Sequence, residues 1–337
     1  MSRRKITFDG LARLPFEEWE EEGQLAPGKK RQEGKRQEPS LPGGDAAPAG
    51  GNLLYYFSMG SGSSGNSCYI GTSEGGIIID AGVRADEIEK MLKANGVSMS
   101  HVKGVLLTHD HNDHVKYVYT LVRNNRHMKV FCTNRVLQGL LRRHPISKRI
   151  KEYHTPIFKE IPFPVAGMEI TAFEVPHDGS DNMGFSIEYD NRRFVLATDM
   201  GRILSRARHY ISGANYLVIE SNYDRRMLLT GRYPEFLKAR IQTETGHMDN
   251  EHTALFLREM VGMGKLEHIF LCHLSKDNNT PEKALTTVRK ALEEAGITVG
   301  AGMETIEDRK AQVQLTALPR YGATRLFVFR RSLAANS

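Results

Sequence analysis

The chain has 337 residues, of which 40% are hydrophobic and 26% charged, so a substantial core in one or two domains is possible. No apolar run reaches the roughly 18 residues of a membrane span, and the basic N-terminus lacks the apolar stretch of a secretory signal. We therefore expect a cytoplasmic protein with no membrane partner. Cys68, Cys132 and Cys272 form no CxxC pair and are expected to be reduced and buried. The formal net charge of +6 suits a polyanionic substrate without proving one.

The first part of the chain differs in composition from the rest. Residues 1–52 are dominated by charged residues, glycine and proline, and such a stretch cannot bury enough apolar surface to offset its chain entropy. We predict a mostly disordered basic arm, in which residues 6–19 could form one short helix.

Residues 53–300 are predicted to form one compact domain, because short apolar strands alternate there with helical patterns. The expected strands are 53–58, 67–71, 77–80, 104–107, 129–132, 169–175, 184–189, 194–198, 216–219 and 268–272. The expected helices are 86–95, 250–260 and 281–295. Residues 301–337 are predicted to be an extension with a late edge strand at 325–330, while 303–321 carries no clear signal. Two β-rich blocks among helices favour two sheets packed face to face with helices outside.

Four metal-ligand side chains fall within six residues at the exit of the buried strand 104–107, and they are His109, His111, Asp113 and His114. Imidazole nitrogen and carboxylate oxygen are ligands that borderline divalent ions take. A loop that leaves a strand can direct the first two side chains to one side and the last two to the other, which would supply two adjacent metals. The alternative, a polar surface loop that happens to be rich in histidine, explains this density poorly.

More polar residues follow apolar strands further along the chain. His177, Asp199 and His273 each come directly after such a strand. Any one of them alone would more often be a cap, a turn residue or a hydrogen-bonded histidine, but together they repeat one ligand placement. Asp80 follows the run 77–79 in the same way, and its favoured role is to orient a neighbouring group.

The HxHxDH cluster, followed by a histidine, an aspartate and a histidine at strand ends, resembles the metallo-β-lactamase superfamily over about residues 53–296. This resemblance implies an α+β fold of the αββα four-layer sandwich type. It also implies that His109, His111 and His177 hold one metal, that Asp113, His114 and His273 hold the other, and that Asp199 bridges the two. Asp80 would stabilise the loop that carries the cluster, and we count Asp80, Asp113 and His247 as catalytic candidates.

Three further segments resemble the YycJ (WalJ) branch of this superfamily. They are the Gly-Ser loop at residues 60–67, the GHMDNE segment at 246–251, which is similar to GHLSNE, and HLSKDNNTP at 273–281, which is similar to HLSxxNNTP. The branch is described as a DNA-processing phosphodiesterase with exonuclease activity on 5′ ends. The N-terminal arm and the segment after about residue 300 lie outside its usual outline.

The expected chemistry is hydrolysis by a hydroxide that bridges two divalent ions, zinc or manganese, since two such ions lower the pKa of a shared water. Basic segments favour a polyanionic substrate, so we predict a nuclease or phosphodiesterase; these segments are 123–126, 142–144, 148–151, 192–193, 206–209 and 225–226. The resemblance to the YycJ (WalJ) branch implies that this substrate is DNA rather than RNA. One alternative is a glyoxalase II-like hydrolase of small thioesters or esters. Another is a DNA-binding module with a degenerate metal site.

Two groups outside the ligand set are candidates for contact with substrate. His247 precedes a predicted helix, and the resemblance to the superfamily's nucleases implies that it could hold a non-bridging phosphate oxygen or protonate the leaving oxygen. It could also be a helix-entry histidine bonded to a carbonyl. The small residues at 60–66 allow backbone amides to approach a phosphate, whereas a flexible hairpin turn is the simpler explanation. The resemblance favours a position at the edge of the site. The proposed substrate contacts are Ser63, Ser64, Asn66 and Asn278.

Overall fold

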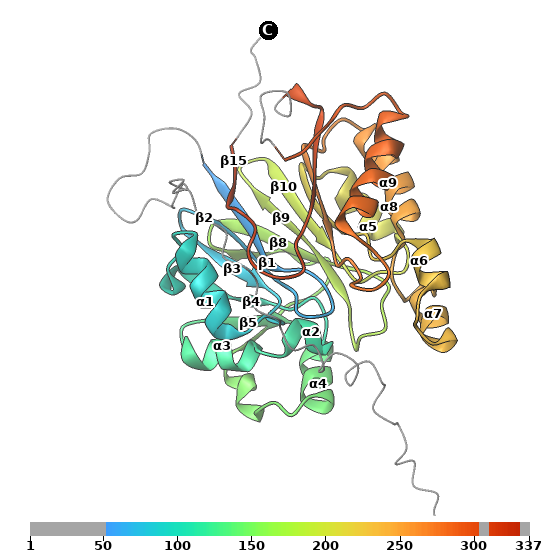
Figure 1. Ribbon diagram of the computed structural model, residues 1–337. Helices are drawn as coiled ribbons and strands as arrows, with labels where there is room; N and C mark the ends of the chain where they lie inside the picture. The colour runs from blue at the N-terminus through green and yellow to red at the C-terminus, as the bar shows by residue number, and fades with distance from the viewer. Residues whose placement is uncertain (1–51, 303–309, 331–337) are drawn as a thin grey trace, which may run out of the picture. The chain divides into compact units, whose positions relative to one another are not determined.

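The computed structural model describes residues 52–302 and 310–330. The predicted N-terminal arm therefore lies outside the described residues, except for Asn52. Within the described part, fifteen strands form two sheets, and helices cover both outer faces, as Figure 1 shows. This arrangement confirms the predicted αββα sandwich.

The first sheet has seven strands in the order β15-β1-β2-β3-β4-β5-β6. Its strands β3 to β6 run parallel, whereas β15, β1, β2 and β3 pair antiparallel. The bounds of its strands are β1 Leu54–Gly60, β2 Ser67–Thr72, β3 Gly75–Ile79, β4 Val102–Leu106, β5 Lys129–Cys132, β6 His154–Pro156 and β15 Phe327–Phe329.

The second sheet has eight strands in the order β13-β14-β12-β11-β10-β9-β8-β7. Its strands from β10 through β11, β12 and β14 to β13 run parallel, and β7, β8, β9 and β10 pair antiparallel. The bounds of its strands are β7 Phe163–Val165, β8 Met168–Glu174, β9 Met183–Tyr189, β10 Arg192–Ala197, β11 Tyr216–Glu220, β12 His268–Cys272, β13 Val299–Gly300 and β14 Val313–Ala317.

Helices pack on the two outer faces (Figure 1). Those associated with the first sheet are α1 Ala85–Ala94, η1 Met99–His101, α2 Asn112–Val115, α3 Val118–Asn124, α4 Asn134–Arg143 and η2 Lys148–Glu152. Those that follow strands of the second sheet are α5 Ser205–Ser212, α6 Arg225–Thr230, α7 Glu235–Ile241, α8 Asn250–Val261 and α9 Pro281–Glu293. Helix α9 begins where Thr280 caps it and Pro281 occupies its first turn. No helix of the described residues is long and apolar enough to cross a membrane.

The core lies between the sheets and under the helices. The Tyr56 ring of β1 contacts the rings of Phe194 in β10 and Phe270 in β12, with centroids 4.9 and 5.0 Å apart, so aromatic side chains join the two sheets. The three cysteines are free and buried, as expected. Burial raises the pKa of the Cys132 thiol to about 12, so this thiol is inert at neutral pH.

The segment after residue 300 contributes strands to both sheets. Strand β14 lies inside the second sheet between β12 and β13. No strand is predicted there from the sequence, because residues 303–321 carry no clear pattern of secondary structure. Strand β15 pairs with β1 at the edge of the first sheet. The β14–β15 connection therefore passes from one sheet to the other, and residues 303–309 and 331–337 lie outside the described part.

Candidate metal centre

The predicted site residues converge where parallel strands of both sheets end. In open α/β sheets, ligands bind outside the carboxyl ends of the strands, because side chains from several strand ends meet there. Asp80, Asp199 and His273 follow β3, β10 and β12, and their φ angles are 61°, 53° and 53°. A left-handed backbone at a non-glycine residue is uncommon, and three of the seven such residues in the described part of the chain lie at these strand ends.

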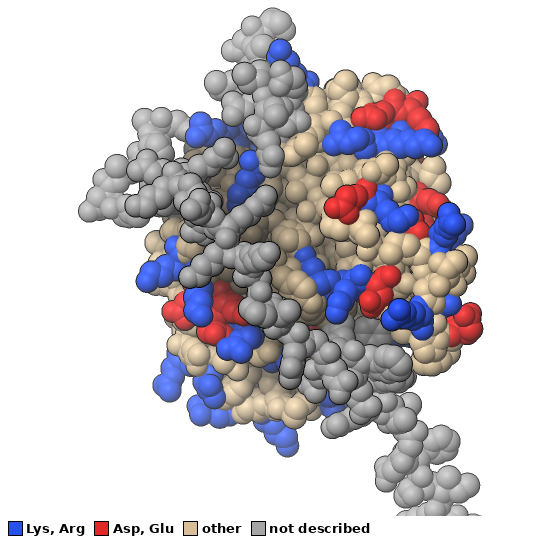
Figure 2. All heavy atoms as spheres, in the orientation of Figure 1, with Lys and Arg blue, Asp and Glu red and all other residues tan. Residues whose placement is uncertain are grey.

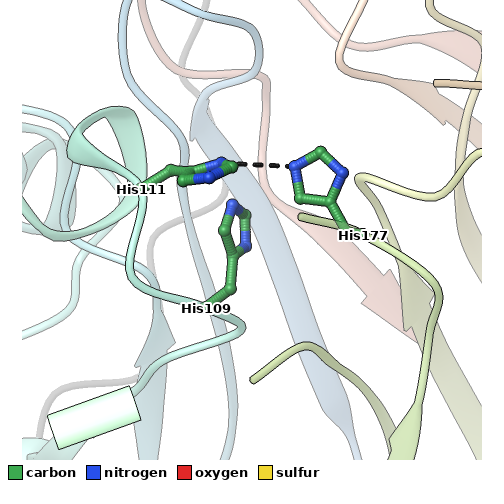
Figure 3. A group of neighbouring side chains, drawn as sticks. All are labelled: His109, His111 and His177. Carbon is green, nitrogen blue, oxygen red and sulfur yellow. Dashed lines mark hydrogen bonds between the residues drawn. The ribbon is translucent and has the colours of Figure 1, made fainter. Parts of the chain in front are cut away.

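The first cluster is formed by His109 and His111, from the loop after β4, and His177, from the loop after β8. Figure 3 shows the three rings turned toward one another. The Nδ1 of His111 lies 3.2 Å from the Nε2 of His177, and the three side chains offer ligand atoms within 4.8 Å of one another. Three imidazoles at this spacing could hold one divalent ion.

The second cluster is formed by Asp113, His114 and His273, whose ligand atoms also lie within 4.8 Å of one another. The Oδ2 of Asp113 lies 3.6 Å from the Nε2 of His114 and 3.5 Å from the Nε2 of His273. These groups come from the two different sheets, so the cluster exists only when both sheets are in place.

Asp199 lies between the two clusters. Its Oδ1 lies 3.8 Å from the Nε2 of His177 and 3.5 Å from the Nε2 of His273, and its Oδ2 lies 3.4 Å from the Nε2 of His114. One carboxylate oxygen therefore faces a member of each cluster. This placement is what a bridging carboxylate requires.

The outward ring nitrogens of these histidines are held by the protein, which fixes the ring orientations. The Nδ1 of His114 lies 2.7 Å from the Oδ2 of Asp80, and Asp80 also accepts hydrogen bonds from the backbone and hydroxyl of Thr108. The Nδ1 of His177 lies 3.0 Å from the carbonyl of Thr245. Asp80 is thus placed behind His114, where it can orient the cluster loop but is shielded from substrate.

Glu220 is a buried site residue that the sequence reasoning missed. It is the last residue of β11, and its Oε1 lies 2.7 Å from the Nδ1 of His247 and 3.1 Å from the Nδ1 of His273. Its Oε2 accepts a hydrogen bond from the backbone of Met200 at 2.8 Å. Glu220 follows the apolar run Tyr216–Ile219, so the same strand-end signal that identified Asp199 and His273 could have found it.

His247 lies beside both clusters, with its ring 5.2 Å from the rings of His177 and His273. Its neighbour on the Nδ1 side is the Glu220 carboxylate rather than a carbonyl, so the alternative of a helix-entry histidine bonded to a carbonyl finds no support. Asp199, Glu220, His247 and His273 also offer ligand atoms within 4.8 Å of one another. Because one Oε1 faces the Nδ1 of two imidazoles, we interpret Glu220 as the group that orients them.

Two further aspartates connect the loops and were not predicted. Asp110 is fully buried and accepts hydrogen bonds from the backbone and hydroxyl of Ser180, both at 2.7 Å. Asp178 lies 3.3 Å from the Nε2 of His111 and accepts hydrogen bonds from Arg240. Each contact joins segments more than 60 residues apart, so no local pattern signals it.

Burial and charge divide the histidines into two groups. Burial lowers the pKa of His109 well below its usual value and lowers that of His111 to about 4. Burial also opposes charge on His114 and His273, but the carboxylates around them, Asp199 above all, outweigh it and raise both pKa values, that of His273 to about 10. The first cluster is therefore neutral at pH 7, and the second combines acidic and basic groups that attract one another.

The unpaired atoms of the clusters fit a metal ion. The Nε2 atoms of His109 and His273 are buried and have no hydrogen-bond partner among the described residues. A buried polar atom without a partner is costly, and both atoms belong to the clusters. A divalent cation would satisfy them, and the donor set of imidazole and carboxylate suits zinc or manganese.

The predicted substrate contacts fall in different places. Asn66 lies at the metal clusters, where its Nδ2 is 3.1 Å from the Oδ2 of Asp113 and 2.9 Å from the Nε2 of His114. Ser63 and Ser64 lie further out on the same loop. Asn278 is only 1% exposed and does not join either cluster, so its side chain is not available to a substrate.

The predicted basic segments are unequal. Arg192 is buried and donates hydrogen bonds to the carbonyls of Phe329 and Asn52, so it cannot serve as a substrate contact. Arg142 and Arg143, at the end of α4, reach the metal loops: Arg142 donates to the hydroxyl of Ser180, and Arg143 lies 3.4 Å from Asp110. Both are exposed. Figure 2 shows separate lysine and arginine side chains on the lower part of the visible face, with an acidic group among those on the left.

Comparisons with known proteins agree with this geometry. A beta-lactamase superfamily domain model matches residues 76–273. The metallo-β-lactamase fold protein YhfI from Bacillus subtilis has a similar structure, with a TM-score of 0.58 and 12% identity over 82% of this chain and 99% of that one. At this identity the likeness shows the fold alone, and the fold is that of the metallo-β-lactamases.

Sequence relatives are more specific. The chain is 34% identical over 255 residues to the exodeoxyribonuclease YycJ of Bacillus anthracis. This match covers 74% of this chain and 94% of the relative. It is 30% identical over 253 residues to the exodeoxyribonuclease WalJ of Streptococcus pneumoniae, with coverage of 75% and 93%. The chain therefore belongs to the YycJ/WalJ family of the metallo-β-lactamase superfamily and is a metal-dependent hydrolase.

Proposed function

We propose that this protein is a nuclease that hydrolyses phosphodiester bonds at the 5′ ends of DNA with the help of two divalent ions, zinc or manganese. The observation that carries the proposal is the pair of ligand clusters that share Asp199. In support, both relatives are named exodeoxyribonucleases, which favours a nuclease over a glyoxalase II-like hydrolase. The complete ligand set argues against a DNA-binding module with a degenerate site.

In this proposal one ion is held by His109, His111 and His177, and the other by Asp113, His114 and His273, with Asp199 in contact with both. When bound, such a pair of ions supplies a nucleophile of lowered pKa and offsets negative charge on the phosphate. Asp80 keeps the His114 ring in place, so the second cluster is organised before any ion arrives.

The protein itself must provide a proton for the leaving oxygen, and His247 is placed to do so. The Glu220 carboxylate can only accept, so it holds the proton on the Nδ1 of His247 and leaves Nε2 to carry the second proton. Glu220 is fully buried, so this contact keeps the orientation of the His247 ring fixed. Protonation by His247 would complete cleavage of a bond to a poor leaving group such as deoxyribose oxygen.

Substrate binding is assigned to exposed positive charge next to the metal loops. Arg142 and Arg143 are tied to Ser180 and Asp110, and these two residues connect the loops that carry His109 and His177. A phosphate bound by these arginines would lie at the rim of the first cluster. Such contacts position a strand without reading its sequence.

The test is digestion of end-labelled single- and double-stranded DNA and RNA by stripped protein, with zinc or manganese added back. The proposal expects cleavage that needs added metal, proceeds from 5′ ends and prefers DNA. Metal-dependent hydrolysis of thioesters with no action on any nucleic acid would overturn it.

A further inference from the structure

The loop at residues 60–66 is attached to the metal clusters at both of its ends. The hydroxyl of Ser61 accepts a hydrogen bond from the backbone of His273 at 2.9 Å. The side chain of Asn66 contacts Asp113 and His114, as described above. The middle of the loop, Ser63 and Ser64, is therefore held at a fixed position beside the second cluster.

The β14–β15 connection packs against this loop and brings Arg320 to it. The Nη1 of Arg320 donates to the hydroxyls of Ser63 and Ser64 at 3.2 and 3.1 Å, and its Nη2 donates to the carbonyl of Leu274, the residue after His273. A Cβ at Gly62 would lie 3.1 Å from Nη1, so glycine there permits the close approach. Among the ion pairs of the described residues, none neutralises Arg320.

The same place offers further hydrogen-bond donors. The backbone N–H groups of Ser63 and Ser64 take part in none of the hydrogen bonds found within residues 52–302 and 310–330. Two adjacent free amides in a turn, the Ser63 hydroxyl and an uncompensated guanidinium form a site for a phosphate. Ser63 is half-buried and Ser64 exposed, so the site opens to solvent.

An aromatic side chain stands directly beside these donors. Tyr321 is 67% exposed, the largest value among the exposed large hydrophobic residues of the described chain. Its hydroxyl accepts a hydrogen bond from Ser64 at 3.1 Å, which holds the ring next to the phosphate donors. An exposed ring fixed in this way can stack on a base, since every base has a flat π-face.

We propose that Arg320, Ser63 and Ser64 bind a phosphate of the substrate strand next to the one that is cleaved, and that Tyr321 stacks on the adjoining base. This inference rests on the proposed nuclease function. It assigns to the β14–β15 connection a role in positioning one nucleotide at the second metal cluster. The phosphate is either the terminal phosphate of the strand or an internal phosphodiester.

The experiment measures kcat and KM of the metal-loaded full chain on a labelled single-stranded oligonucleotide between about 50 and 200 mM salt. Arg320→Ala should raise KM about ten-fold. The plot of log kcat/KM against log salt falls with salt, and its slope should become less steep by about one, because one phosphate contact is lost. Arg320→Lys should restore the slope, since it keeps the charge. Arg258→Ala, an exposed arginine on α8, is the matched control.

Tyr321→Ala should raise KM about ten-fold without changing the salt slope, because stacking carries no charge, and Tyr321→Phe should recover most of the loss. Oligonucleotides with a terminal phosphate or a terminal hydroxyl show whether the bound phosphate is the terminal one or an internal phosphodiester. If Arg320→Ala removes a preference for the phosphorylated end, the terminal phosphate is bound; equal losses on both ends indicate an internal phosphodiester.

The inference is overturned if folded Arg320→Ala and Tyr321→Ala match Arg258→Ala in KM and salt slope while the wild type cleaves DNA. A wild type that does not cleave DNA would instead refute the proposed function. If Arg320→Ala fails to fold, as thermal melting would show, Arg320→Gln takes its place, because it can still donate to the loop but carries no charge. The two Tyr321 variants test the stacking contact independently.

Discussion

Glu220 offers the sharpest test of the proton donor, because its carboxylate joins His247 to the metal clusters. Glu220→Gln keeps the shape but removes the charge. An amide cannot accept from the Met200 N–H on one side and from the histidine rings on the other, so one buried donor loses its partner. That loss costs about 1–3 kcal/mol of stability. The unpaired His247 would also lose its fixed tautomer, and we expect DNA cleavage to slow about 100-fold, the order seen when a group that orients a site is removed.

The assay compares turnover of DNA with turnover of an aryl phosphodiester, whose leaving group needs no proton. If Glu220 acts through His247, the defect should be much smaller on the aryl substrate. The matched control is Glu267→Gln, because Glu267 precedes β12 at the other end of the strand and binds Asn215 and Tyr216. It should lose stability without loss of activity. Equal defects on both substrates would refute the role in protonation, and loss of one bound metal would make Glu220 a ligand.

Three other changes test separate parts of the argument. Asp113→Ala should release about one metal ion per chain and reduce DNA cleavage by orders of magnitude, as metal analysis and kinetics would show, since both ions are needed; full occupancy with normal turnover would contradict the assignment. Changing Arg142 and Arg143 to glutamate should weaken DNA binding, and by about the same factor for unrelated DNA sequences. Filter binding at several salt concentrations measures this affinity. Burial lowers the pKa of His268 to about 3. Between pH 6.5 and 3 this imidazole is therefore protonated in the unfolded chain but neutral in the folded one, so the free energy of unfolding falls as the pH falls through that window. Denaturation of metal-free protein should show a loss of about 2.3 kcal/mol in the free energy of unfolding from pH 6.5 to 4.5, and His268→Phe should remove this loss. An unchanged pH dependence in the variant would count against this cause.

The sequence predicts the fold well where apolar runs are uninterrupted. The β12 run His268–Cys272 is predicted to the residue, because burial on both faces leaves an unbroken apolar pattern. Strand β14 was missed because Gln314 interrupts its pattern, although that side chain is buried and accepts a hydrogen bond from Gly302. Helix α4 was missed because Gly139 weakens its helical signal. A Cβ at Gly139 would meet the Asp110 carboxylate at 2.1 Å, so the glycine serves tertiary packing.

The ligand residues could be proposed from sequence because each lies at a strand end, and strand ends are local features. Their partners could not be proposed in this way. Arg240 reaches Asp178 across 62 positions, and Arg320 reaches Ser63 across 257. Such contacts depend on how the two sheets and their connections pack, and this packing has no periodic signature in the chain.

The strained residues show how the fold prepares the site. Asp199 and His273 have left-handed backbones that cost about 1–3 kcal/mol each, and they persist only where the surrounding structure holds them. Here the holding structure is the set of parallel strands β10, β11 and β12, which are buried almost throughout. His273 directly follows the last residue of β12, and Asp199 lies two positions after the last residue of β10. The core therefore supplies the energy that keeps both clusters assembled, and sequence changes in β11 that leave every ligand intact should still disturb the site.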